Sequence, residues 1–179
     1  MVRLMLPWLV SGWLIGVVVF SLRLLLTWRH VGLLRTSQVT PVAEHLASAA
    51  RRLADRMGLR CKVTLLESKI AEVPMVIGWL KPVILLPVAA TSGLSVSQID
   101  AILAHELAHV RRWDCPVNLL QSIVETILFY HPAVWWVSRT IRQERENCCD
   151  DIASEVCGDR VTYVRALLQL EELRQPESL

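Results

Sequence analysis

The chain has 179 residues, enough for one ordinary domain or for a small domain with membrane segments. It is 53% hydrophobic with a mean hydropathy of +0.40, which is high for a soluble protein, and its formal net charge of +2 is too small to indicate binding to nucleic acid. Its five cysteines are odd in number and suggest no disulfide pattern, so we expect reduced thiols in a cytoplasmic environment.

The first element is an uncharged segment from Leu4 to Leu22, which lies between Arg3 and Arg23. Its length is close to the roughly 20 residues that cross a bilayer as a helix. It shows neither the polar stripe of a soluble helix nor the cleavage site of a secretory signal. We therefore predict a transmembrane helix and its flank at residues 1–36. Arginines outnumber acids after this helix, which places its C-terminal side in the cytoplasm by the positive-inside rule.

The region after this helix is predicted to hold one helix and then short strands. Apolar residues recur at helical spacing over residues 41–58. Short apolar or alternating runs follow at residues 61–67, 75–77 and 83–86, and the turn-forming residues 78–82 predict a hairpin between the last two. The strands serve packing alone, or one of them is an edge along which an enzyme pairs extended substrate backbone. The sequence leaves both readings open.

The most informative segment has the pattern H-E-x-x-H and lies inside an apolar helical run that Ser95 and Gln98 can cap. His105 and His109 are four residues apart, so they share one helix face and can both bind a single Zn²⁺. Glu106 would then accept a proton from a water that the metal activates. Three polar groups in apolar surroundings would be costly to bury without such a partner. A match this short also arises by chance, in helices whose histidines bind nothing.

Residues 117–137 form a second apolar stretch, which polar residues interrupt at three- and four-residue steps. This spacing puts them on one stripe of a helix, and the stripe must face protein or a wet cavity because Glu125 in contact with lipid would be costly. We predict a membrane-embedded helix with one inward polar face, kinked by Pro132; a core helix of a soluble domain is the alternative. Two more helices are predicted at residues 138–156 and 160–173, separated by a glycine.

A catalytic zinc needs a third protein ligand and an open coordination position. Glu146 and Asp150 lie four residues apart on one face of the helix predicted at 138–156. We predict that Glu146 binds the zinc and that Asp150 orients a liganding histidine through its second ring nitrogen. Cys148 and Cys149 are alternative ligands, but a mixed nitrogen and oxygen set suits a hydrolytic zinc better.

Three segments carry a resemblance to a known family: ILAHELAHVRRWD, FYHPAVWW and RQERENCCDDIA. They resemble the BlaR/MecR family of membrane-anchored zinc peptidases, which includes β-lactam-sensing signal transducers. The resemblance covers roughly residues 60–170. It implies that His105, His109 and Glu146 bind one Zn²⁺ per chain and that Glu106 is the general base. It also implies a gluzincin-like fold, mainly α with a small β-hairpin or sheet, which we place at residues 37–179.

The family also implies several membrane helices with the zinc domain on the cytoplasmic side of a bacterial membrane, the side that the arginines indicate. The expected partners are the lipid bilayer and a cytoplasmic protein or peptide substrate, either a transcriptional repressor or the protein itself, and no nucleic acid. The β-lactam sensors also carry an extracellular penicillin-binding-like domain. This sequence has no such domain, so we do not expect antibiotic sensing from these residues.

Two further residues are candidates for lesser roles. His131 is a candidate oxyanion donor or substrate contact, with a structural histidine beside Pro132 as the alternative. Asp114 is expected to hold the helix end or the nearby arginines, or to be a solvated charge. Three other functions share part of this pattern: a quality-control protease like the Ste24/HtpX group, an intramembrane site-2-type protease, and a zinc-stabilised signalling module without turnover. The site-2 type needs an Asp-bearing motif that is absent, and the intact Glu106 counts against the inactive module.

Overall fold

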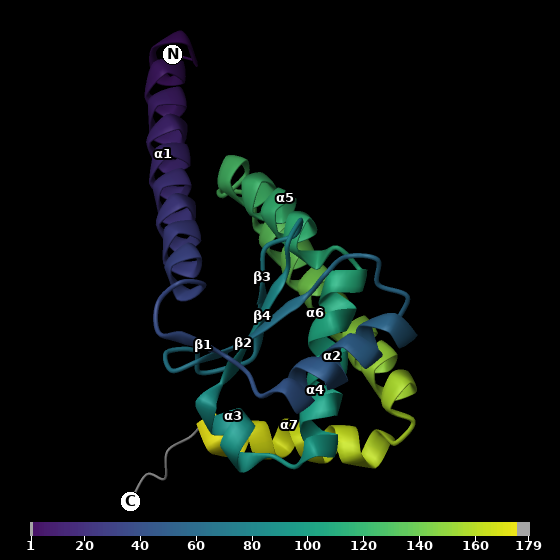
Figure 1. Ribbon diagram of the computed structural model, residues 1–179. Coiled ribbons are helices and arrows are strands. Elements are labelled where there is room, and N and C mark those ends of the chain that lie inside the picture. The colour runs from purple at the N-terminus through teal and green to yellow at the C-terminus, as the bar shows by residue number, and fades with distance from the viewer. Residues whose placement is uncertain (1, 175–179) are drawn as a thin grey trace, which may run out of the picture.

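The computed structural model describes residues 2–174 and is mainly helical with one four-stranded sheet, which confirms the predicted fold class (Figure 1). The five last residues of the predicted domain 37–179 lie outside the described residues. The elements in chain order are α1 (Val2–Leu34), β1 (Val39–Pro41), α2 (Glu44–Arg56), β2 (Thr64–Ser68), β3 (Met75–Ile77), β4 (Val83–Pro87), α3 (Val88–Gly93), α4 (Val96–Arg111), α5 (Asp114–Ile127), α6 (Pro132–Cys157) and α7 (Arg160–Arg174).

Helix α1 extends well beyond the uncharged segment that predicted it, and its N-terminal part projects beyond the rest of the fold (Figure 1). Its part from Met5 to Leu34 is, among the described residues, the one helix long and apolar enough to cross a membrane. None of its most apolar window is buried by the rest of the protein, and Trp8 is 81% exposed. A soluble protein rarely exposes so large a continuous apolar surface, so this helix needs an apolar environment.

The sheet has the order β1-β2-β4-β3, with β2 and β4 parallel and β3 and β4 antiparallel. The predicted hairpin is confirmed, with Val76 opposite Ile84. Strand β4 is buried along its whole length, whereas β3 pairs on one side only and is an edge strand. The edge strand β1 was not predicted, because three residues that end in a proline give almost no periodic signal.

Helix α4 lies at the centre of the helical part and contacts α2, α5, α6 and α7. Leu103 and Leu107 on this helix are fully buried. The predicted capping box is confirmed at its start. The backbone N–H of Gln98 donates to the Ser95 hydroxyl, and the backbone N–H of Ser95 donates to the Gln98 side-chain oxygen. Burial of its apolar face, worth about 1.5–3 kcal/mol for each large side chain, fixes which way its polar residues point.

The structure corrects the prediction of one helix over residues 117–137. Helix α5 ends at Ile127, a turn follows, and α6 begins at Pro132. The proline starts a helix rather than kinking one, because its missing N–H is no loss in the first turn while the preceding residue, His131, is held extended. The polar stripe does face protein: Gln121 donates to the Ser138 carbonyl at 2.8 Å. We call α5, α6 up to Ile141 and the turn between them the α5–α6 hairpin.

Candidate metal centre

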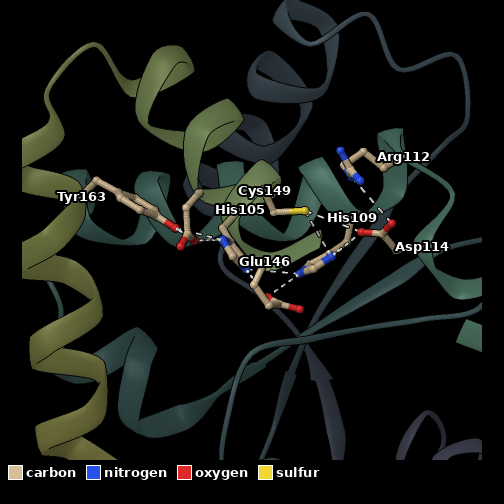
Figure 2. A network of polar contacts seen from close by, with 8 residues as sticks. His105, His109, Arg112, Asp114, Glu146, Cys149 and Tyr163 are labelled. Carbon is tan, nitrogen blue, oxygen red and sulfur yellow. Dashed lines mark hydrogen bonds and ion pairs between the residues drawn. The ribbon is translucent and has the colours of Figure 1, made fainter. Parts of the chain in front are cut away.

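Helix α4 presents His105 and His109 on one face, and α6 brings Glu146 to the same point (Figure 2). The two histidine Nε2 atoms are 3.2 Å apart. The Glu146 Oε2 atom lies 3.5 Å from His105 Nε2 and 3.6 Å from His109 Nε2. The structure therefore brings together the three residues that the sequence singled out as ligands, with their potential donor atoms within 4.8 Å of one another.

A carboxylate and a phenol hold the far side of the His105 ring. Its Nδ1 atom lies 3.0 Å from Asp150 Oδ1 and 2.9 Å from the Tyr163 hydroxyl, which itself donates to Asp150 at 2.5 Å. Asp150 therefore lies where the sequence put it, one turn after Glu146. Tyr163 comes from α7, far along the chain, and was not predicted. An acceptor at Nδ1 keeps the proton on that nitrogen and leaves the Nε2 lone pair free to bind a metal.

A second carboxylate holds the far side of the His109 ring. Asp114 is 4% exposed, and its Oδ2 atom lies 2.7 Å from His109 Nδ1. The chain reaches this position because Trp113 adopts a left-handed conformation, with φ +60°, that turns α4 directly into α5. Asp114 also lies 3.7 Å from Arg112 Nε, so the predicted contact with the arginines exists beside its closer contact with His109.

The thiol of Cys149 completes the surroundings of His109 (Figure 2). Its sulfur is fully buried, 3.4 Å from His109 Nδ1 and 3.6 Å from Asp114 Oδ2. Burial, and then the negative charge of Asp114, raise the pKa of this thiol far above its usual range. The Cys149 sulfur therefore lies on the Nδ1 side of the His109 ring, away from the point where the two Nε2 atoms and Glu146 converge, and groups instead with His109 and Asp114.

Burial and charge act against each other at the three acidic and basic groups of the centre. Burial raises the pKa of Glu106, while the neighbouring histidines lower it by less. Burial lowers the pKa of His105, but its contact with Glu146 and nearby carboxylates outweigh this and raise it overall. The contact with His105 in turn lowers the pKa of Glu146. The carboxylate of Glu146 is thus kept ionised, as a ligand must be, and Glu106 is made a stronger base.

The centre opens into a cleft of about 780 Å³ that Glu106, His105, His109 and Glu146 all line. The other walls come from residues 27–35 at the end of α1, residues 74–79 around β3, and the first turns of α5. The unpaired edge of the sheet and the end of the apolar helix therefore border the same cavity. A cavity of this size is in the range of ligand and substrate sites.

The structure does not bring His131, a candidate oxyanion donor or substrate contact, to the cleft. This residue begins α6 at the far tip of the α5–α6 hairpin and lines an apolar groove there, not the cleft. The contact of Asp114 with His109 and the presence of Tyr163 beside His105 were not predicted from the sequence. A buried acid five residues after His109 was a weak signal for the first. A lone tyrosine in the last helix gave no signal for the second.

The donor set fits a hydrolytic zinc. Two imidazole Nε2 atoms and one carboxylate oxygen converge, each imidazole has an acceptor at its other nitrogen, and the cleft leaves one side open. Three protein ligands of this type with an open position are characteristic of catalytic rather than structural zinc sites. A structural site would close the fourth position with another side chain.

The chain is similar to known proteins over most of its length. The regulatory protein BlaR1 of Bacillus licheniformis is 24% identical over 168 residues, which cover 93% of this chain and 28% of BlaR1. The methicillin resistance mecR1 protein of Staphylococcus aureus is 25% identical over 168 residues, which cover 93% of this chain and 27% of that protein. The chain thus spans about a quarter of the length of these relatives.

Among solved structures, Ste24p of S. mikatae has a similar fold, with a TM-score of 0.60 at 16% identity over 86% of this chain and 50% of Ste24p. At that identity the likeness concerns the fold alone. The model of the family described as BlaR1 peptidase M56 matches residues 2–178, nearly the whole chain. The chain therefore belongs to the BlaR1 peptidase M56 family of metallopeptidases.

Proposed function

We propose that this protein is a zinc endopeptidase, tethered to the membrane by α1, that cleaves a protein at the cytoplasmic face. One observation carries the proposal: two imidazoles and a carboxylate from α4 and α6 converge at the wall of an open cleft, beside the buried carboxylate of Glu106. The His105, His109 and Glu146 side chains would hold the ion. A structural zinc site would need neither the cleft nor the extra acid.

The residues of the chain have distinct roles in this reaction. When bound, the ion supplies Lewis-acid polarisation of a water and of a peptide carbonyl. Glu106 accepts the proton of the attacking water and returns it to the leaving amine, and the rise of its pKa by burial suits both steps. Asp114 and Asp150 hold the imidazoles in the tautomer and orientation that leave Nε2 available.

The edge strand β3 is suited to hold the substrate. It lines the cleft together with the candidate ligands, and its outer side has no strand partner among the described residues. An extended peptide can pair with such an edge through backbone hydrogen bonds, which align it independently of its side chains. The substrate segment must then be extended or unfolded. This supports the reading of the strands as a substrate edge rather than as packing alone.

The orientation and the partner follow from charge and from the relatives. The arginine excess after the apolar segment favours a cytoplasmic position for the centre, and the five free cysteines agree with it. The two relatives are named as a regulatory protein and as a methicillin resistance protein. We therefore propose a regulatory role in transmembrane signalling, with a transcriptional repressor or the protein itself as substrate. A quality-control protease is the second candidate, because the fold resembles that of Ste24p.

The test compares membranes that contain the wild-type chain, Glu106→Gln, and the control Glu155→Gln, whose side chain is exposed on α6. Zinc content and cleavage of a candidate cytoplasmic repressor are measured in each. We expect equal zinc in all three, cleavage by the wild type and the control, and a loss of about 10²–10⁴-fold for Glu106→Gln. Equal cleavage by all three would rule out the proposed peptidase activity with Glu106 as its general base. Cleavage of unrelated unfolded proteins as fast as the repressor would favour quality control.

A further inference from the structure

The tip of the α5–α6 hairpin packs against the apolar helix α1. The Trp13 indole N–H donates to the Ile127 carbonyl at 3.0 Å. The rings of Phe20 and Phe129 stack with their centroids 5.1 Å apart. Gly16 lies between these two contacts, and a Cβ there would come within 2.1 Å of the Phe129 ring. The tip of the hairpin therefore packs closely against the middle of α1, at the level of residues 13–20.

The position of these contacts along α1 sets the depth of the hairpin. Trp13 precedes Arg23, the first charge after the uncharged segment, by ten residues. At about 1.5 Å of rise per residue, this puts Trp13 roughly 15 Å inside a bilayer whose hydrocarbon is about 30 Å thick. If α1 crosses the membrane, a hairpin tip that touches Trp13 must lie well inside the hydrocarbon as well.

We propose that the α5–α6 hairpin is a re-entrant membrane element. It enters the bilayer from the side of the catalytic cleft, turns beside the middle of α1 and leaves on the same side. The inference rests on the proposed membrane crossing of α1 and adds a second lipid contact to it. It replaces the single membrane-embedded helix that the sequence suggested at residues 117–137.

The outer surface of the hairpin matches lipid in composition. Its exposed large apolar side chains include Leu120, Val124, Trp136, Val137 and Ile141, and Arg139, seven residues after the start of α6, is the exposed charge on this surface. An apolar groove of about 490 Å³ runs between α5 and α6 on this surface. The exposed apolar surface of the hairpin adjoins that of α1, so one partner that covers both is the hydrocarbon of the bilayer. An acyl chain is the occupant we assign to the groove.

The polar groups of the hairpin are arranged as hydrocarbon requires. Glu125 on α5 forms an ion pair at 2.8 Å with Arg142, the residue on α6 that directly follows the hairpin, so this acid does not face lipid uncompensated. The turn leaves carbonyl groups at the end of α5, and two indoles donate to them: Trp13 to Ile127, and Trp135 to Phe129 at 2.7 Å. Backbone carbonyls without partners are costly in lipid, and these contacts remove that cost at the turn.

The hairpin also fixes the height of the metal centre. Helix α5 runs from Asp114, beside His109, to Ile127 at the tip, and α6 returns from the tip to Glu146. The 14 residues of α5 correspond to about 20 Å of helix, so the centre lies just outside the hydrocarbon. Substrates would be cut close to the membrane surface.

Quenching of tryptophan fluorescence by lipid tests the proposal in the full chain. The protein is reconstituted into phosphatidylcholine vesicles whose acyl chains are brominated at mid-chain, and into unbrominated vesicles. Trp136→Phe removes an indole that is 71% exposed on the hairpin. Trp79→Phe removes one that is 52% exposed beside the cleft, and Trp8→Phe removes one on α1. These exchanges keep an apolar ring and so leave the fold intact.

We expect the bromine-sensitive part of the emission to fall in Trp136→Phe and in Trp8→Phe and to stay unchanged in Trp79→Phe. If Trp8 contributes quenched emission and Trp136 does not, the re-entrant hairpin is wrong while the crossing of α1 stands. If neither contributes, the proposed tether fails as well. A protein partner or a second copy on this surface would also shield Trp136 from the bromines, and that result would overturn the assignment to lipid.

Discussion

The Nδ1 atom of His109 lies 2.7 Å from the carboxylate of Asp114, although the two residues belong to different helices. The left-handed Trp113 between them makes the contact, because it turns the chain back toward the helix it has just left. The same turn starts α5 and therefore the α5–α6 hairpin. One backbone feature thus orients a candidate ligand and directs the hairpin toward α1.

Asp114→Asn tests the orienting role of this carboxylate. An amide cannot hold the His109 proton as the carboxylate does, so we expect zinc affinity to fall by about 10–100-fold. Affinity is measured by competition with a chelator of known strength. Asp151→Asn is the control, since this acid is exposed and pairs with Arg160 at the surface, away from the centre. Equal affinities for wild type and Asp114→Asn would remove Asp114 from the centre.

Tyr163→Phe tests the contribution of α7. The hydroxyl donates to Asp150 and lies 2.9 Å from His105, while the direct contact of Asp150 with His105 remains in the variant. We expect a loss of about 1 kcal/mol in unfolding free energy and a smaller fall in zinc affinity than for Asp114→Asn. Denaturation and chelator competition measure the two effects. A larger loss of zinc than in Asp114→Asn would mean that Tyr163 acts more directly on the metal.

Gly16→Ala tests the packing of α1 against the hairpin tip. The added methyl would meet the Phe129 ring, which already stacks on Phe20, so something must shift. We expect a destabilisation of about 1–3 kcal/mol, measured by thermal unfolding in detergent. Gly12→Ala is the matched control on the same helix, because nothing lies within 4 Å of its added methyl. Equal unfolding temperatures for the two variants would show that the contact with Phe129 does not form.

Chelation tests whether the ion also stabilises the fold. Binding to the folded chain alone adds stability, about 2.7 kcal/mol at a free zinc concentration 100 times the dissociation constant. We expect EDTA to lower the unfolding temperature and abolish cleavage, and zinc to restore both. Glu146→Gln should show little of this shift, because it lacks one proposed ligand. An unfolding temperature that EDTA leaves unchanged would contradict binding at this site.

Local patterns predicted the parts of the site that depend on one helix. His105 and His109 share a face because of helical spacing, and the capping box at Ser95 needed only two residues three apart. The relation between Glu146 and Asp150 is equally local. Spacing alone does not predict that α4 and α6 pack against each other and so bring Glu146 to the two histidines. The resemblance to a known family implied this.

The remaining parts depend on tertiary packing or on rare backbone states. A left-handed conformation at Trp113 is uncommon for a residue with a side chain, so nothing local indicates that Asp114 returns to His109. Tyr163 reaches His105 only because α7 packs on α4. Pro132 was compatible with a kink or with a helix start, and the proline rule alone does not choose between them.

Zinc content per purified chain tests the centre most directly, in wild type, Glu146→Gln and Glu144→Gln. Glu144 is a matched control, because it lies two residues away on the same helix with an exposed side chain. The account predicts about one zinc per chain in wild type and Glu144→Gln, bound by nitrogen and oxygen ligands in X-ray absorption spectra. It predicts a large loss of zinc in Glu146→Gln. Full zinc content in Glu146→Gln, or its loss in Glu144→Gln instead, would contradict the proposed centre.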